Sequence, residues 1–323
     1  MTSAIVIALK ELLDLRRNRF LLAILGFVLV AVVISVVVSA TQFGAKLDAY
    51  ITYLDALRTA GNTTTPAAPQ LFPLQLLRGS IEYLEILGAL FAIVMGYGMI
   101  AKEKQRSTLQ LIYSRPIGRF SLPAGKLLAL AAAWLIAVVV IFSAVTATVA
   151  IVGHAQFASI DVQRLLIAGA TAWGYLLLWS ALALGLASTT TRLSTALIIA
   201  LVLWLTVVLI LPQIGDTMDP DNQVPGGLFK SLAIAKPDEK AVLANFSGFD
   251  TVRNGLEVSS ITKHYERFTF AVLGIKDQFN QQPLAAVWTG TWNNAVALWL
   301  AAFAALGFAL LTTTRTKLLR RTS

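Results

Sequence analysis

The sequence contains no cysteine and little charge. Of its 323 residues 13% are charged, whereas soluble globular chains carry about 25%. Without cysteine the chain can form no disulfide scaffold, thiol nucleophile, iron–sulfur cluster or thiolate zinc site. Hydrophobic residues make up 57% of the chain and the mean hydropathy is +0.72. There are too few polar side chains to cover a water-soluble surface, so the composition predicts a membrane protein.

Apolar runs long enough to cross a bilayer occur six times. About 20 helical residues are needed to cross the ~30 Å hydrocarbon core. Backbone polar groups find no water in lipid, so each run is expected to form an α-helix. The sequence therefore predicts an all-α polytopic membrane protein with six transmembrane helices, over residues 20–40, 82–101, 127–152, 165–187, 193–215 and 291–311.

The segment before the first span has helical periodicity. Ile5, Leu9, Leu12 and Leu13 recur at helical spacing, which predicts an amphipathic interfacial helix within residues 1–19. A plain extension of the first span is one alternative. A signal peptide cleaved near Ala40 is another, but its apolar region would have about 7 to 15 residues, and this run has 21.

The distribution of charge predicts the orientation. One set of connecting segments holds 15 basic and 3 acidic residues: the two termini, the loop at 102–126 and the turn at Arg192. The other set, at 41–81, 153–164 and 216–290 together with Glu82 and Glu85, holds 11 basic and 14 acidic residues. The positive-inside rule then predicts cytoplasmic termini in a cell membrane. The long segment 216–290 is predicted to be an extracytoplasmic domain, followed by the sixth span and a basic tail within 291–323.

Small residues on the fourth span indicate close helix packing. Ala181, Gly185 and Ser188 recur at about one-turn spacing. Such a stripe lets the backbones of two membrane helices approach each other. We expect this face to be buried against a neighbouring helix.

Polar groups that could form a site are few. The apolar cores of the spans hold no ionisable residue apart from Glu82 and Glu85, which lie in the outer turns of the second span. These two glutamates have two interpretations, a solvated helix entrance or a carboxylate-lined outer vestibule. His154 and His264 have no metal-ligand spacing with other residues, so no metal site is expected. Because the positive charge follows the orientation rule, no nucleic-acid partner is expected either.

A phosphate-binding loop is also absent. The nearest approach is the stretch from Gly118 to Lys126, which has six residues between its glycines, whereas a P-loop has four. Leu127 replaces the required Ser or Thr. Backbone amides must converge on the phosphates at fixed geometry, so this spacing excludes the site. Any energy from ATP is expected to reach the chain through another polypeptide.

The loop after the second span contains a specific motif. Residues 102–119 begin with mixed charge, continue at helical spacing and end in a Pro-Gly turn. This stretch resembles the corresponding loop of type 2 ABC transporter permeases. Ser107 and Gln110 stand where that family usually has Gly and Glu. The positions that match are Glu103, Thr108, Leu109, Leu111, Ser114, Arg115 and Pro116.

This resemblance implies a membrane subunit, with no ATPase site of its own, that dimerises and is driven by a separate cytoplasmic ABC ATPase holding ATP and Mg. The loop would be a coupling helix seated on that ATPase. The residues implied in coupling are Glu103, Arg106, Thr108, Leu109, Arg115 and Pro116. Closure of the ATPases would push these loops and open an outward path. A basic loop that obeys only the orientation rule is the alternative.

Three functions remain open at this stage. The first is an exporter, and the uncharged spans favour an amphiphilic or lipid-like cargo drawn from the surrounding membrane lipids. The second is transmission of ATP-driven motion to an extracytoplasmic partner protein, as implied by a resemblance to the subgroup containing the nitrous oxide reductase maturation permease. The third is a non-transporting membrane scaffold or receptor.

Overall fold

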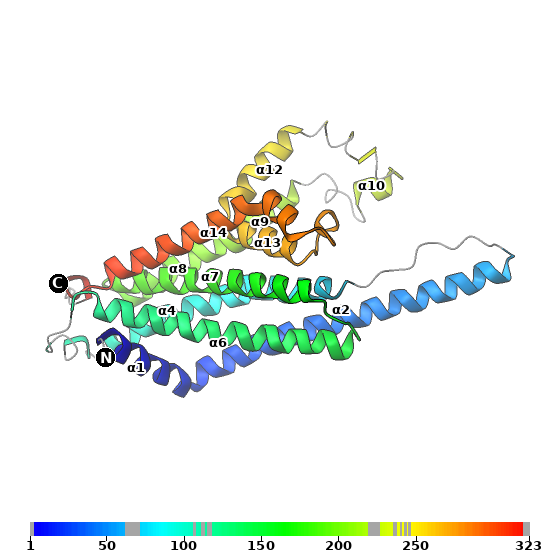
Figure 1. Cartoon of the computed structure of the whole chain (residues 1–323). Coiled ribbons are helices and arrows are strands. Elements are labelled where there is room, and N and C mark those ends of the chain that lie inside the picture. Colours follow the sequence, from blue (N-terminus) through cyan, green and yellow to red (C-terminus); the bar gives the residue numbers. More distant parts are fainter. Residues whose placement is uncertain are drawn as a thin grey trace.

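The fold was analysed in a computed structural model of the whole chain. The structure describes residues 3–61, 72–105, 108–110, 114, 118–218, 227–234, 238–239, 241, 244 and 247–318. Within these residues the chain is helical and contains no strand. The long helices lie side by side in a bundle, with both chain termini at the same end (Figure 1). The prediction of an all-α polytopic membrane protein is confirmed.

All six predicted spans form helices long and apolar enough to cross a membrane. Each reaches at least as far as its predicted bounds, because capping and polar end turns extend a helix beyond its apolar core. The second and fifth spans are interrupted by π-helical turns. The first span is α2 (Arg19–Thr59). The second consists of η1 (Pro73–Leu77), α3 (Arg78–Tyr83), η2 (Leu84–Gly88) and α4 (Ala89–Gln105), and the fifth consists of α8 (Leu193–Trp204), η3 (Leu205–Ile210) and α9 (Leu211–Thr217). The third, fourth and sixth spans are the single helices α6 (Ser121–Val152), α7 (Ser159–Thr189) and α14 (Leu284–Thr312).

Helix α1 (Ser3–Arg17) is separate from α2 and lies against the start of α6. The break falls at Asn18, whose side chain caps α2 by accepting from the Leu21 amide. Gly125 permits the close approach of α1, since a Cβ at this position would lie 2.7 Å from the Ala4 carbonyl oxygen. Several apolar side chains of α1 stay exposed, namely Ile5, Val6, Leu9 and Leu13. This exposed apolar face is what an interfacial helix requires.

The helix that contains the first predicted span does not end at Ala40. Helix α2 continues without interruption to Thr59 and projects beyond the bundle (Figure 1). Its outer part contains no proline, and the helix formers Ala and Leu recur there, so the helix continues almost to Gly61. About 19 residues of the predicted outer segment are therefore helical, which corresponds to roughly 28 Å.

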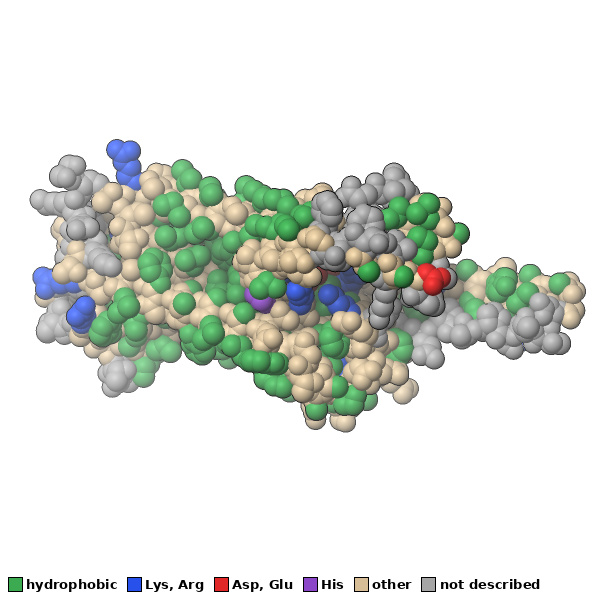
Figure 2. Space-filling model, turned by 90° about the horizontal axis from the view of Figure 1, so that it is seen from above, with side chains coloured by type: hydrophobic (Ala, Val, Ile, Leu, Met, Phe, Trp, Pro, Cys, Tyr) green, Lys and Arg blue, Asp and Glu red, His purple; other side chains and the backbone are tan. Residues whose placement is uncertain are grey.

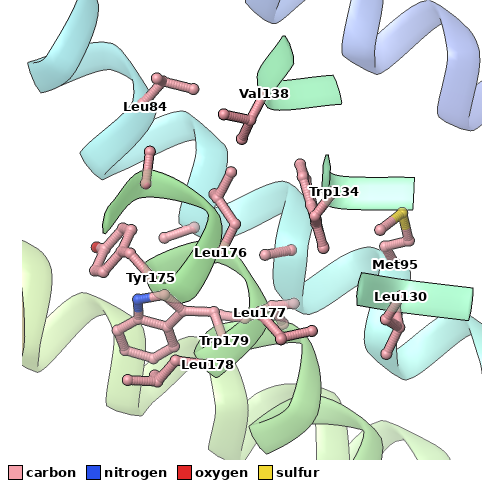
Figure 3. Close-up of a cluster of buried hydrophobic side chains, with 14 of the residues drawn as sticks. Leu84, Met95, Leu130, Trp134, Val138, Tyr175, Leu176, Leu177, Leu178 and Trp179 are labelled. Atoms are coloured by element: carbon pink, nitrogen blue, oxygen red, sulfur yellow. The ribbon is translucent and has the colours of Figure 1, made fainter. Parts of the chain in front are cut away.

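The core is centred on α7, which packs against α4 on one side and α14 on another. Leu176, Leu177, Trp134 and Met95 are among its buried side chains (Figure 3). Lipid is as apolar as leucine, so small residues and hydrogen bonds must bring these helices together. At Gly96 an added Cβ would overlap the Ser180 backbone, so the α4–α7 contact requires glycine there.

The predicted packing face of the fourth span is confirmed. Ala181, Gly185 and Ser188 are all buried on α7. The Ser188 hydroxyl lies 2.9 Å from that of Thr313, directly after α14. Gly185 lies against the Phe308 ring of α14.

The 216–290 segment contributes described helices at the end of the bundle opposite the termini (Figure 1). Helix α13 packs against α7 and α14. Its apolar stretch from Phe268 belongs to this packing, and α13 with its 12 residues is too short to span. The described elements are α10 (Leu228–Ser231), α12 (Ser247–Ser259), α13 (Ile261–Val272) and η5 (Asp277–Phe279).

The surface agrees with a chain embedded in lipid. On the face shown in Figure 2, hydrophobic side chains cover much of the bundle, and lysines and arginines gather at one end and near the 216–290 segment. Exposed large apolar residues occur along α2, α6, α8 and α14, including Phe27, Ile136, Ile198 and Phe303. Such surfaces are stable against hydrocarbon, not water.

Candidate functional site

A fully buried lysine occupies the end of the bundle that holds the termini. Lys126 lies in the second turn of α6 and has no exposed surface. Its ammonium donates to the Glu11 carboxylate and the Glu103 carboxylate, both at 2.9 Å, and to the Met99 carbonyl oxygen at 3.0 Å. All three donor positions of the ammonium are therefore used.

These contacts join three elements that are far apart in sequence. Glu11 comes from α1, Glu103 from the last turn of α4 and Lys126 from α6. Lys10, which is half exposed, adds a second cation 3.1 Å from Glu11 and 3.5 Å from Glu103. We refer to Lys10, Glu11, Glu103 and Lys126 as the Lys126 cluster. It fixes the interfacial helix to the two spans that flank the predicted coupling loop.

The cluster sets the ionisation of its members on α1. Burial by itself raises the pKa of Glu11, but the charges and hydrogen bonds of Lys126 and Lys10 outweigh it and lower the pKa below its ordinary value. Burial alone lowers the pKa of Lys10, and Glu11, Glu103 and Asp14 together raise it instead. Both residues are thus held in their charged forms.

The two oxygens of the Glu103 carboxylate differ in their contacts with the described residues. The Oε1 atom of Glu103 accepts from Lys126, whereas Oε2 is buried and accepts no hydrogen bond from the described residues. An unsatisfied buried carboxylate oxygen costs free energy. Among the described residues, Glu103 is held through its Oε1 atom, which Lys126 and Lys10 both contact.

The predicted coupling residues are described only in part. Glu103 is in the cluster, and the backbone amide and hydroxyl of Thr108 both donate to the Glu103 carbonyl oxygen, closing the turn after α4. Leu109 is buried in the main core. The other three predicted coupling residues, Arg106, Arg115 and Pro116, lie outside the described residues.

The same turn is also tied to the end of α7. Lys104 donates to the carbonyl oxygens of Ala187 and Thr190, at 2.7 and 2.8 Å. These carbonyls belong to the carboxyl end of a helix, where a cation is electrostatically favoured. Glu103 and Lys104, at the start of the predicted coupling loop, therefore contact α1, α6 and α7.

Sequence reasoning missed Lys126, Glu11 and Lys104 as site residues. Lysines at the ends of membrane helices normally extend toward the headgroups, and nothing local distinguishes Lys126 from that case. The available signal was the pair Gly125-Lys126, in which a small residue precedes a cation at the start of an apolar run. The pair serves helix packing and the ion cluster.

At the opposite end, Glu82 and Glu85 have different environments. Glu82 is exposed and pairs with Arg78 at 3.0 Å. Glu85 is buried in the π-helical turn η2, and its backbone carbonyl accepts from the Tyr175 hydroxyl at 2.9 Å. Their predicted role as an outer vestibule is not tested by these contacts. The π-helical turn frees a carbonyl, and Tyr175 satisfies it.

The second π-helical turn, η3, is satisfied by the 216–290 segment. The Ser260 hydroxyl, at the start of α13, donates to the Val207 carbonyl oxygen at 2.7 Å. Thr262 of α13 lies 3.2 Å from the Tyr175 hydroxyl, and the Tyr265 ring stacks on Tyr175 at 4.4 Å. Helix α13 is thus bound at the irregular turns of both interrupted spans.

Arg164 provides a further anchor for the same segment. It is buried near the start of α7 and donates to the carbonyl oxygens of Val272 and Gln282. The residues that the structure describes contain no group of three His, Cys, Asp or Glu suited to a metal. His264 instead contacts the Asn294 side chain and the Val258 carbonyl oxygen.

Comparison with known proteins agrees with this architecture. A family model described as ABC-2 family transporter protein matches residues 5–316. The chain belongs to the ABC-2 transporter family. A search of curated proteins finds no match. The family match covers α1, all six spans and the Lys126 cluster, so it applies to nearly the whole molecule.

Membership in the ABC-2 family defines the general role of the chain. It is the multi-pass membrane permease subunit of an ABC transporter. Subunits of this family lack an ATPase site and work with an ATPase subunit. The Lys126 cluster therefore lies in a permease that must receive its driving force from another protein.

Proposed function

We propose that this ABC-2 permease is the translocation subunit of an ATP-driven exporter, working as a homodimer with a separate cytoplasmic ATPase that holds ATP and Mg. The termini and the loop at 102–126 face the cytoplasm of the cell, as the charge distribution supports. The single observation that carries the proposal is the Lys126 cluster. It links the loop expected to meet the ATPase with α1, α4 and α6.

In the proposed cycle, ATP-driven closure of the ATPases pushes on the loop that follows Glu103. A flexible linker would absorb this push. Glu103 is instead bound to Lys126, and Lys104 is bound to the end of α7, so several helices move together. A packed core with two discrete arrangements can convert such a displacement into an opening at the far end.

The proposed cargo is an amphiphilic or lipid-like molecule. The charged residues Glu85, Lys126 and Arg164 are buried near the ends of the spans and engaged in local contacts. Small ions and protons usually require ionisable groups at membrane depth. An apolar interior between these ends favours a cargo that is itself mostly apolar.

A second candidate is transmission of motion to an extracytoplasmic partner protein, as in the maturation-permease subgroup. The observation that favours it is the anchoring of α13 to both π-helical turns and to Arg164. Movement of the spans would be carried to the 216–290 segment through these contacts. In this case ATP hydrolysis would continue without movement of lipid.

The experiment is purification of the full chain from its source cells with any ABC ATPase that co-purifies, followed by reconstitution into vesicles with a fluorescent phospholipid. We expect a stoichiometric complex and ATP-dependent movement of the lipid to the outer face. Absence of any bound ATPase would support a scaffold. Hydrolysis without lipid movement would favour the partner-protein alternative.

The contribution of Glu103 is tested in the same vesicles. Glu103→Gln preserves size and removes the charge that binds Lys126, and we expect lipid-stimulated ATP hydrolysis to fall about tenfold. The matched control is Asp48→Asn, an exposed acid on the outer part of α2. Equal turnover in both variants would contradict a coupling role for the cluster.

A further inference from the structure

An apolar cavity opens between α6 and α7, in the half of the bundle away from the termini. Its volume is 700 Å³. The walls run from Leu135 to Ala150 on α6 and from Val162 to Trp173 on α7, with Phe157 from the segment just before α7. No charged side chain lines it. Ligand pockets in proteins have volumes of about 300 to 1,000 Å³ and mainly apolar walls, so this cavity has the size and lining of a binding site.

The polar groups in the wall are largely already used. The Trp173 indole donates to the Ala131 carbonyl oxygen at 2.8 Å, and the Thr146 hydroxyl donates to the Phe142 carbonyl oxygen at 2.7 Å. A buried water needs two to four polar partners. The cavity offers very little for water to bind, and its natural filling is hydrocarbon.

The cavity is open toward the lipid. Leu135, Val139, Val162 and Leu166 line it and are also exposed on the outer surface of the bundle. Small residues in the wall create the space. At Gly169 an added Cβ would lie 3.7 Å from Val138 and 4.0 Å from Phe142, which is ordinary van der Waals contact.

The length of the cavity suits an extended chain. The α6 wall covers about 15 residue steps, or roughly 22 Å. An extended alkyl chain, whose carbons approach their neighbours to about 4 Å, can lie along this length against the apolar side chains of the wall.

We infer that this cavity binds one acyl chain of a bilayer phospholipid. The chain enters from the lipid side past Leu166 and lies along α6 and α7, against the fixed ring of Trp173. That ring is held by its hydrogen bond to Ala131 and by contact with Trp299. The site is separate from the Lys126 cluster, and its occupation does not depend on the proposed export activity.

The test uses the full chain in nanodiscs that contain phosphatidylcholine with a photoactivatable diazirine on one acyl chain. After irradiation, the labelled peptides are mapped by mass spectrometry. We expect labelling of the walls at 135–150 and 157–173 to exceed that of the lipid-facing residues Leu300 and Phe303 on α14 about tenfold. Uniform labelling of all exposed surfaces would mean ordinary surrounding lipid and would overturn the inference.

Cavity-filling variants make the test specific. Gly169→Leu and Ala147→Leu each place a side chain in the cavity from opposite walls, and leucine favours a helix at either position. We expect each variant to lower wall labelling about tenfold while keeping its size-exclusion profile. The matched control is Ala304→Leu on the exposed surface of α14, which should label as the parent does.

Two further outcomes would also overturn the inference. One is unchanged wall labelling in both filled variants, since the lipid would then lie outside the cavity. The other is displacement of the lipid label by a small excess of a single-chain alkyl amphiphile, because the occupant would then be a free amphiphile, not a bilayer lipid. Retention of the label against that competitor supports the phospholipid.

Discussion

Lys126 shows how one residue determines the relation between three helices. Its ammonium is fully buried, and its charge is balanced by Glu11 and Glu103. Replacing a buried ion pair by apolar groups of similar size is often harmless, whereas removing one member leaves a charge without compensation. The contribution of the cluster to the stability of the fold can therefore be measured separately from its contribution to coupling.

A pair of variants makes this separation. Lys126→Met leaves two carboxylates facing each other, and we expect it to lower the free energy of unfolding by about 3–5 kcal/mol. Adding Glu11→Gln and Glu103→Gln removes the stranded charges and should restore most of that loss. Thermal unfolding of the purified protein measures both. A triple variant as unstable as Lys126→Met would show that the charges are not the cause.

The residue scale also shows what the sequence could predict. Ala181, Gly185 and Ser188 were recognisable because their spacing on one helix is local information, and the face they form is buried. The Lys126 cluster was not recognisable, since it forms only when α1 folds back onto α6. Lys126 then contacts both Glu103 and Glu11, and Glu11 is more than one hundred positions away from it in the sequence.

At the scale of elements, the interrupted spans are the informative ones. The turns η2 and η3 are π-helical, and each has a carbonyl that accepts a hydrogen bond from a side chain outside its own helix. Such turns are frequent at functional sites. Pro212, two residues after η3, has no amide hydrogen to donate back into that turn, whereas no proline lies in or directly after η2. Hydropathy alone located the spans but not their irregular turns.

The variant Tyr175→Phe removes the hydroxyl that joins η2 to α13. We expect a loss of about 1 kcal/mol and faster amide hydrogen exchange in residues 84–88 and in α13. Tyr53→Phe, on the exposed outer part of α2, is the matched control. Exchange that rises equally in both variants, or in neither, would argue against the hydroxyl as the connection.

The ion pair between α12 and α13 predicts that the stability of their contact depends on pH. Burial raises the pKa of Glu257, but Arg267 and Arg253 outweigh it and hold the pKa below the ordinary 4.5. Because the folded value is lower, the stabilisation is complete above pH 4.5 and is lost as the pH falls through the folded value.

Pepsin cleavage within α12, followed between about pH 5 and pH 2, measures this loss. We expect cleavage to rise at the acid end. Glu257→Gln should be cut at a high rate at every pH, with no rise in cleavage as the pH falls. Glu266→Gln, whose partner is Lys263 on α13 itself, should keep this pH-dependent step in the cleavage rate. A step that persists in Glu257→Gln would assign the transition to another group.

At the scale of the whole molecule, the number of spans and the family follow from composition, hydropathy and one loop motif. The extent of α2 did not follow, because its outer part mixes polar and charged residues with apolar ones and lies outside the apolar window. The absence of cysteine, which excluded several chemistries, is also an experimental advantage. Single cysteines can be introduced without removing any native thiol.

Orientation is tested by such cysteines. We expect Thr52→Cys, on the outer part of α2, to react with a membrane-impermeant maleimide in intact cells. Gln110→Cys, in the predicted coupling loop, should react only after lysis, and Ala304→Cys, on the lipid-facing surface of α14, should not react in either case. Labelling of position 110 from outside would show that the protein has the opposite orientation, which would exclude the proposed contact with a cytoplasmic ATPase.

The unbroken length of α2 makes it a lever. Its 41 residues extend over about 60 Å, and its base at Asn18 adjoins the helix that Lys126 holds. A rotation of about 10° at that base would sweep the distal end near Thr59 through roughly 10 Å. The same rotation would move the part of α2 that packs in the bundle near Val36 by about half as much, so the largest displacement falls on the end that projects beyond the bundle.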